Sequence, residues 1–260
     1  MNAQRMIYWD GGKQRTLSKR EELFMGLYRL RTEVREKEVA RTFDISKSSF
    51  HIWIVSFAPY LRNKELSALI KFLTLKAVQR HMLESFRDFP NTRVILDCTE
   101  VRIQKPSKLN APRQTFSPYK HYNTFKALEG VTPDGHVCFV PDFRGSHISD
   151  IEAVEKSGLV DLLEPGDAVM VDKGFCLDTI LPPAVQIHIP FFKRGTQLSA
   201  SEVIATRKIA GARFHVERVI RRIKEFHFLD TLMPVNTLHI AGCIFRTCAL
   251  LCNFQGLIIS

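Results

Sequence analysis

The stretch Val94-Ile95-Leu96-Asp97-Cys98-Thr99-Glu100-Val101-Arg102-Ile103 changes its pattern halfway along its length. It begins as a continuous apolar run and then alternates between apolar and polar side chains. This pattern predicts a buried strand that emerges into solvent at its end. Asp97 falls inside the strand, where a carboxylate is costly unless it is solvated, hydrogen-bonded or bound to a metal.

Strands and helices follow one another downstream of this segment. The turn Thr132-Pro133-Asp134-Gly135 predicts a hairpin between Phe125–Thr132 and His136–Val140. The other predicted elements are a helix over 149–163 that opens with a capping box, strands over 168–172 and 184–189, a long helix over 199–228 with a break near Gly211, and a helix over 238–254. Their order predicts an α/β fold whose sheet mixes strand directions.

The first 90 residues read as helices instead. Ser18-Lys19-Arg20-Glu21 fits a capping box and predicts a helix over about 18–33. A short helix over 38–43, a turn and a second helix over 47–57 make a helix-turn-helix candidate, with an ordinary α-hairpin as an equal alternative. The second helix would present four polar residues outward, namely Lys47, Ser48, Ser49 and His51.

The segment Lys64–Phe89 is predicted to continue as basic helix, and we place a domain boundary near Pro90. The expected organisation is therefore a small all-α, helix-turn-helix-like module over 1–90 and an α/β domain over 91–260. Six widely spaced cysteines contain no C-x-x-C pair, so we expect reduced, mostly buried thiols of an intracellular protein. Arg246 interrupts the most apolar segment, and neither a signal peptide nor a membrane span is predicted.

Charge is distributed unevenly along the chain, whose net charge is +10. Residues 1–90 carry 17 basic and 10 acidic side chains, residues 91–190 carry 10 and 13, and residues 191–260 carry 10 and 4. An acidic middle third flanked by basic segments suits a metal-dependent enzyme that acts on phosphodiesters, although scattered surface charges explain the same numbers. Nucleic acid is the first candidate for an anionic partner.

Three carboxylates occupy positions where they would contribute little to the stability of the fold. Asp97 follows Val94-Ile95-Leu96 within its strand, Asp172 follows Val169-Met170-Val171 at a strand end, and Glu217 lies in a helix rich in arginine. Each also has an ordinary explanation, because the two aspartates could end their strands and cap turns. Glu217 could likewise form ion pairs with Arg221 and Arg213 on a solvated helix.

Taken together, the three segments that carry these acids resemble the Harbinger-type DDE transposases and the nucleases derived from them, over about residues 18–255. The resemblance rests on Ile95–Glu100, Val171–Phe175 and the pattern Arg213-x3-Glu217-x6-Lys224, with further likeness in 144–150 and 115–120. It implies an RNase H-like fold, a mixed sheet that holds the first two acids on neighbouring strands with the third on a helix beside them. It also implies a helix-turn-helix module upstream.

The resemblance further implies a catalytic site of Asp97, Asp172 and Glu217 that binds divalent metal, Mg²⁺ or Mn²⁺, as a pair of ions. Asp97 would bridge both ions, and Asp172 and Glu217 would each hold one. Hard cations of this kind prefer carboxylate oxygens and serve the in-line displacement of a phosphoryl group. Asp150 is a fourth carboxylate near the implied site, for which helix capping is the favoured explanation.

Basic and aromatic side chains alternate in the loop that follows the first strand, and basic residues continue along the Glu217 helix. Such a surface grips a phosphate backbone in a salt-dependent way, although a solvated loop has the same composition. The predicted DNA contacts are Lys105, Lys108, Arg113, Tyr119, Lys120, Lys126, Arg218, Arg221 and Arg222, with Lys47, Ser48 and His51 from the helix-turn-helix candidate.

The expected function is a metal-dependent DNA endonuclease or transposase domain. A domesticated transposase relic that binds DNA or a protein and no longer cuts is the main alternative, and an RNA-acting nuclease of the same fold is a weaker one. The resemblance implies DNA as the substrate and a nuclear location. It leaves room for a separate sequence-specific DNA-binding partner, Myb-like in some relatives, and for a homo-oligomer, whereas no membrane partner is expected.

Overall fold

A mixed sheet forms the centre of the protein. The computed structural model describes residues 17–32, 34–61, 68–107, 110–191 and 199–256. The central strand β1 (Thr92–Arg102) pairs antiparallel with β3 (Tyr122–Val131) and parallel with β6 (Ala168–Met170), which in turn pairs parallel with β7 (Gln186–His188). Three short strands pair with β3, namely β2 (Phe116–Ser117), β4 (Val137–Phe139) and β5 (Arg144–Gly145).

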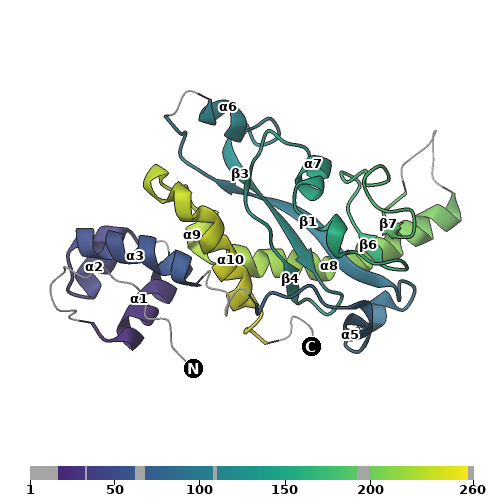
Figure 1. The fold of residues 1–260 in the computed structure, drawn as a ribbon, viewed down its shortest axis with the longest axis horizontal. Coiled ribbons are helices and arrows are strands. Elements are labelled where there is room, and N and C mark those ends of the chain that lie inside the picture. Colours follow the sequence, from purple (N-terminus) through teal and green to yellow (C-terminus); the bar gives the residue numbers. More distant parts are fainter. Residues whose placement is uncertain (1–16, 33, 62–67, 108–109, 192–198, 257–260) are drawn as a thin grey trace.

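Helices cover both faces of this sheet (Figure 1). Successive side chains of a strand point to opposite faces, so Val94 and Leu96 of β1 join one core with Val154 of α7 (Asp150–Glu155). Ile95 and Val101 join the other core with side chains of α8 (Ala200–Lys224) and α10 (Ala241–Cys252). The mixed sheet flanked by helices confirms the predicted α/β class and the RNase H-like fold.

The long helix α8 runs unbroken for 25 residues. Its start has the full capping box of Ser199 and Glu202, in which each side chain bonds the other residue's backbone N–H. The break predicted near Gly211 does not occur, because Ile209, Ala212 and Val219 keep one face of the helix buried in the core. Two shorter elements follow, α9 (His227–Asp230) and η3 (Val235–Ile240).

Three helices form the N-terminal part, α1 (Lys19–Arg31), α2 (Glu36–Thr42) and α3 (Lys47–Leu61). The starts predicted for the first and third helices are confirmed, and α2 begins two residues before the predicted residue 38. They share a small apolar core that includes Phe50 and Trp53. Asp44 has a left-handed backbone (φ 51°) in the turn between α2 and α3. The helices and turn form in the predicted order, and their use as a DNA-binding helix-turn-helix stays a prediction.

These helices pack against the rest of the chain, as Figure 1 shows for α1 and α3 beside α9 and α10. Arg31 of α1 forms an ion pair with Glu225 at 2.9 Å, and the Arg29 guanidinium lies 4.5 Å from the centroid of the Phe228 ring. The boundary predicted near Pro90 stays a prediction.

The basic helix predicted over 64–89 is wrong for the residues that the structure describes there. From residue 68 onward only α5 (Leu75–Gln79) and the 3₁₀ turn η1 (Glu84–Phe86) are helical, and residues 62–67 lie outside the described part. The reason is tertiary, since Phe72 and Phe86 pack into the two different cores of the sheet. A continuous helix could not supply both contacts.

Two further expectations need adjustment. The helix predicted over 149–163 ends at Glu155, because Gly158 takes a left-handed backbone (φ 79°) and a 3₁₀ turn, η2 (Val160–Leu162), follows. The stretch Val235–Cys252 is long and apolar enough to cross a membrane by length and composition, but 56% of it is buried within the protein. Its apolar side chains are accounted for by packing against α3 and α8.

Candidate active site

The register of β1 and β6 brings Asp97 and Asp172 together. Ile95 is paired with Met170 in this parallel ladder, and each aspartate lies two residues further along its chain. Because side chains alternate along a strand, each aspartate faces the same side as Ile95 and Met170, which belong to the core beneath α8. Asp97, in the middle of β1, and Asp172, two residues after the end of β6, therefore lie on neighbouring segments just beyond the last pair of the β1–β6 ladder.

Asp97 lies in an environment that disfavours its charge. Burial raises the pKa of its carboxyl group above the ordinary value, and the nearby carboxylates of Asp172 and Asp150 raise it further. The Arg213 guanidinium and the backbone N–H of Cys98, which donates to Oδ1 at 2.9 Å, oppose this shift. A cation bound beside Asp97 would favour the charged form of its carboxyl group, as Arg213 does.

Arg213 of α8 supplies the nearest positive charge. Its Nη1 lies 2.9 Å from Oδ1 of Asp172, and the Arg213 side chain is buried while that of Asp172 is half exposed. The Nε–H of Arg213 is buried without a hydrogen-bond partner. A divalent cation at this place would therefore compete with Arg213 for Asp172.

Glu217 lies one helical turn beyond Arg213 on α8, so the two residues share a side of the helix. Its side chain is exposed, and it is not among the groups that shift the pKa of Asp97. No three His, Cys, Asp or Glu side chains of the described ranges lie close enough together to hold a metal ion. The structure thus brings the first two predicted acids together and leaves the third apart from them, so the role of Glu217 stays a prediction.

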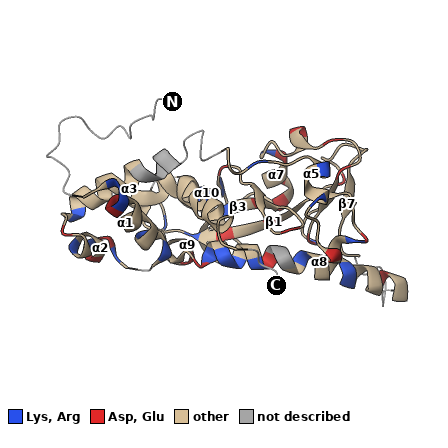
Figure 2. Ribbon diagram, turned by 90° about the horizontal axis from the view of Figure 1, so that it is seen from below, with Lys and Arg blue, Asp and Glu red and all other residues tan. Residues whose placement is uncertain are grey.

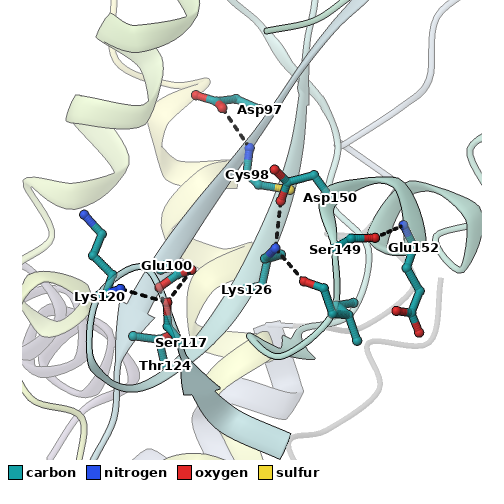
Figure 3. A network of polar contacts seen from close by, with 11 residues as sticks. Asp97, Cys98, Glu100, Ser117, Lys120, Thr124, Lys126, Ser149, Asp150 and Glu152 are labelled. Atoms are coloured by element: carbon teal, nitrogen blue, oxygen red, sulfur yellow. Dashed lines mark hydrogen bonds and ion pairs between the residues drawn. The ribbon is translucent and has the colours of Figure 1, made fainter. Parts of the chain in front are cut away.

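Asp150 does not cap its helix, which corrects the interpretation from sequence. Ser149 is the N-cap of α7 and accepts from the backbone N–H of Glu152. The Asp150 carboxylate instead forms an ion pair with Lys126 at 2.7 Å, and Figure 3 shows the pair beside Cys98 of β1. Asp150 thus lies with Lys126 on the other face of β1, and its charge still contributes to raising the pKa of Asp97.

Glu129 is the site residue that the sequence analysis missed. It is paired with Asp97 in the antiparallel ladder of β1 and β3, and it is 0% exposed. Burial and the charge of Asp97 raise its pKa well above the ordinary value, while Lys224 of α8 opposes the shift. The available signal was an acid inside the otherwise apolar run Ala127–Val131, the same signal that drew attention to Asp97.

A dependence of stability on pH follows from Glu129. Because its folded-state pKa is raised above the ordinary 4.5, the folded chain keeps a proton that the unfolded chain loses. A chelating buffer keeps metal ions from binding. Under these conditions the contribution of Glu129 to the free energy of unfolding is greatest below about pH 4.5, and it is lost as the pH rises toward the folded-state pKa. We expect Glu129→Gln to remove this part of the decline, measured as the free energy of unfolding in urea across pH. Equal declines in both proteins would contradict the prediction.

The residues predicted to contact DNA differ in exposure. Lys105, Arg113, Tyr119 and Lys120 are exposed around the β2–β3 turn, as are Arg221 on α8 and Lys47 and Ser48 on α3. Arg218 and Arg222 are partly buried, and basic residues run along α8 in Figure 2. Lys108 lies outside the described residues.

Two members of the predicted DNA-contacting set point elsewhere. Lys126 is buried, and its ammonium group donates to the Ile148 carbonyl and to Asp150, both at 2.7 Å. The His51 ring of α3 lies 3.5 Å from the Glu36 carboxylate of α2. Lys126 is held by contacts inside the protein, and His51 is only one-third exposed beside an acidic side chain, so we leave both out of the DNA-contacting surface proposed below.

The donor chemistry around Asp97 fits a hard divalent cation. The available groups are carboxylates, which Mg²⁺ and Mn²⁺ prefer, and one of them, Glu129, is buried without any hydrogen-bond partner. An RNase H-like sheet with acids side by side on neighbouring strands is the arrangement expected of nucleases and transposases.

The family model of the DDE superfamily endonucleases matches residues 96–253, which is more than half of the chain. The chain therefore belongs to the DDE superfamily endonucleases, a membership that supports a nuclease or transposase type of function with DNA as substrate. No curated protein and no solved structure matches the chain. The Harbinger subtype stays a prediction.

Proposed function

We propose that the chain is a metal-dependent DNA endonuclease of the transposase type, which cuts phosphodiester bonds by hydrolysis or strand transfer. The observation that carries this proposal is the parallel register that places Asp97 and Asp172 side by side just beyond the last pair of the β1–β6 ladder, in a member of this family. Side chains converging from separate strands form a site that no stretch of sequence contains. Acids that only end a strand or cap a turn have no reason to lie close together, because like charges repel each other.

In this proposal Asp97, Asp172 and Glu217 hold divalent metal, Mg²⁺ or Mn²⁺, as two ions. The ions would supply positive charge to the reacting phosphate and lower the pKa of the attacking water or hydroxyl. Asp97 is fixed for this task by the Cys98 N–H, and Asp172 is oriented by the N–H of Lys173 at 2.8 Å. Glu217 would join them from α8.

The exposed basic and aromatic residues around the β2–β3 turn would hold the DNA backbone. Lys120 lies over the Tyr119 ring, 4.8 Å from its centroid, and Tyr119 is 80% exposed. Paired cations and rings of this kind bind nucleic acid without reading its sequence. A nuclear location, a separate sequence-specific partner and a homo-oligomer belong to the same proposal.

The non-cutting relic is the second candidate, and one observation favours it. Arg213 is paired with Asp172, and Glu217 is exposed rather than grouped with the other two acids. A protein that had lost catalysis could keep this ion pair permanently, because no cation would need to displace the arginine.

A cleavage assay on supercoiled plasmid separates the two candidates. The endonuclease should convert the plasmid to nicked circles with Mg²⁺ or Mn²⁺ and should leave it intact with a chelator. Salt-sensitive binding of duplex DNA without cleavage under any metal would overturn the first candidate in favour of the relic. Cleavage confined to an RNA substrate would indicate the RNA-acting alternative.

The DNA-holding surface can be tested through the salt dependence of binding. We expect Lys120→Ala to weaken binding of duplexes of any sequence about equally, and to lower the slope of log affinity against log salt by about 1, because one phosphate contact is lost. Fluorescence anisotropy at several salt concentrations measures both. Lys76→Ala is the matched control, since Lys76 is exposed on α5, away from the β2–β3 turn. A slope unchanged in Lys120→Ala would remove this residue from the surface.

A further inference from the structure

Glu129 stands in line with the two aspartates of the candidate site. β3 places it opposite Asp97, and β6 brings Asp172 to the other side of Asp97. The three carboxylates thus follow one another across β6, β1 and β3, on the face of the sheet that α8 covers. Opposite residues of an antiparallel pair have Cβ atoms only about 4.5–5.5 Å apart, so Glu129 is within reach of whatever Asp97 binds.

The lack of a partner is what separates Glu129 from a structural acid. Both of its carboxylate oxygens are fully buried without a hydrogen bond. Glu100, on the other face of the same two strands, accepts from the hydroxyls of Ser117 at 3.0 Å and Thr124 at 2.9 Å (Figure 3). Each carboxylate oxygen of Glu100 therefore accepts a hydrogen bond, whereas neither oxygen of Glu129 does.

A buried carboxylate without partners is costly, and its neighbours on the same face of β3, Ala127 and Val131, are apolar. Lys224 is the positive group whose charge acts on it, whereas Asp97 repels it. No hydrogen bond to Lys224 compensates the burial. A cation bound beside Asp97 would compensate both acids at once.

We propose that Glu129 is a further carboxylate of the metal site, which adds its negative charge and an oxygen ligand to the cation held by Asp97. This inference rests on the proposed function, since it requires a metal at Asp97. It assigns to this chain a ligand from the third strand of the site, in addition to those from β1, β6 and α8.

Metal binding by the full chain, without DNA, tests the inference independently of cleavage. Mn²⁺ affinity is measured by calorimetry and by the electron paramagnetic resonance signal of free Mn²⁺, and the rise in melting temperature with Mn²⁺ is recorded alongside. We expect Glu129→Gln to weaken Mn²⁺ binding about 10- to 100-fold and to reduce that rise. Glu100→Gln is the matched control and should bind within about twofold of the wild type.

The outcomes distinguish failure of this inference from failure of the proposed function. Wild-type affinity in Glu129→Gln, with binding lost in Asp97→Asn, would overturn the inference and leave the proposed site standing. Wild-type affinity in Asp97→Asn as well would overturn both. If Glu129→Gln does not fold by circular dichroism, Glu129→Asp replaces it, and affinity equal to that of the wild type would again overturn the inference. Equal weakening in Glu100→Gln would also overturn it.

Discussion

Nicking of supercoiled DNA should fall at least about 10³-fold in Asp97→Asn, equivalent to about 4 kcal/mol of transition-state stabilisation. The substitution keeps the shape of the side chain and removes the charge that would hold the metal. Because burial and neighbouring carboxylates raise the pKa of Asp97, its charge is already disfavoured, and the asparagine variant should be no less stable than the wild type. Loss of activity without loss of stability is the diagnostic result.

The same assay extends to the other two proposed ligands. Asp172→Asn and Glu217→Gln should fall by comparable factors, and Asp161→Asn, an exposed acid of η2, should cleave at the wild-type rate. A nicking rate above a tenth of the wild-type rate in Asp97→Asn would contradict the proposed mechanism. The same residual activity in Glu217→Gln alone would remove that residue from the site and agree with its exposed position.

The largest effect on stability is expected at the ion pair of Arg93 and Asp167. Both side chains are buried, with Nη1 of Arg93 2.5 Å from Oδ2 of Asp167, and Nε of Arg93 donates to the Leu73 carbonyl at 2.7 Å. Asp167→Ala would leave the buried guanidinium only the more distant and largely exposed Glu164 carboxylate, at 3.5 Å, and loss of the buried partner costs about 3–5 kcal/mol. Urea denaturation of the two proteins at pH 7 measures the difference in free energy of unfolding.

An exposed pair provides the comparison. Lys208 and Asp88 lie 2.8 Å apart but are about half exposed, so Asp88→Ala should cost less than about 0.5 kcal/mol. The double variant Arg93→Met with Asp167→Leu should recover much of the stability lost in Asp167→Ala, because neither charge remains buried alone. A cost below about 1 kcal/mol for Asp167→Ala would contradict the prediction.

The ion pair of Arg93 and Asp167 also affects the candidate active site. Arg93 and Asp167 flank the place where the β1–β6 pairing starts, with Thr92 opposite Ala168. The pairing that begins there, with a register shift between Thr92 and Val94, reaches Asp97 five residues after Thr92 and Asp172 four residues after Ala168. Weakening the pair should therefore loosen the alignment of the two acids as well as the fold.

Local patterns were enough to predict most elements. The capping boxes at Ser18 and Ser199, the turn at Thr132–Gly135 and the apolar run before Asp97 each reflect contacts between residues close in sequence, and the corresponding helices, hairpin and strand are present. The segment 68–89 was predicted wrongly because its side chains are divided between two cores formed by distant residues. No local pattern contains that information.

The sequence by itself determined the family, and it singled out Asp97 and Asp172 as candidates, because a carboxylate next to an apolar run is costly wherever the strand lies. Only the tertiary structure decided which charged side chains lie next to these acids. The ladders β1–β6 and β1–β3 place Asp172 and Glu129 on either side of Asp97, and the packing of α8 sets Arg213 against Asp172. These neighbours come from strands and helices far apart in the chain. Interaction between their charges depends on distance in space, which hydrogen-bond register and helix packing fix.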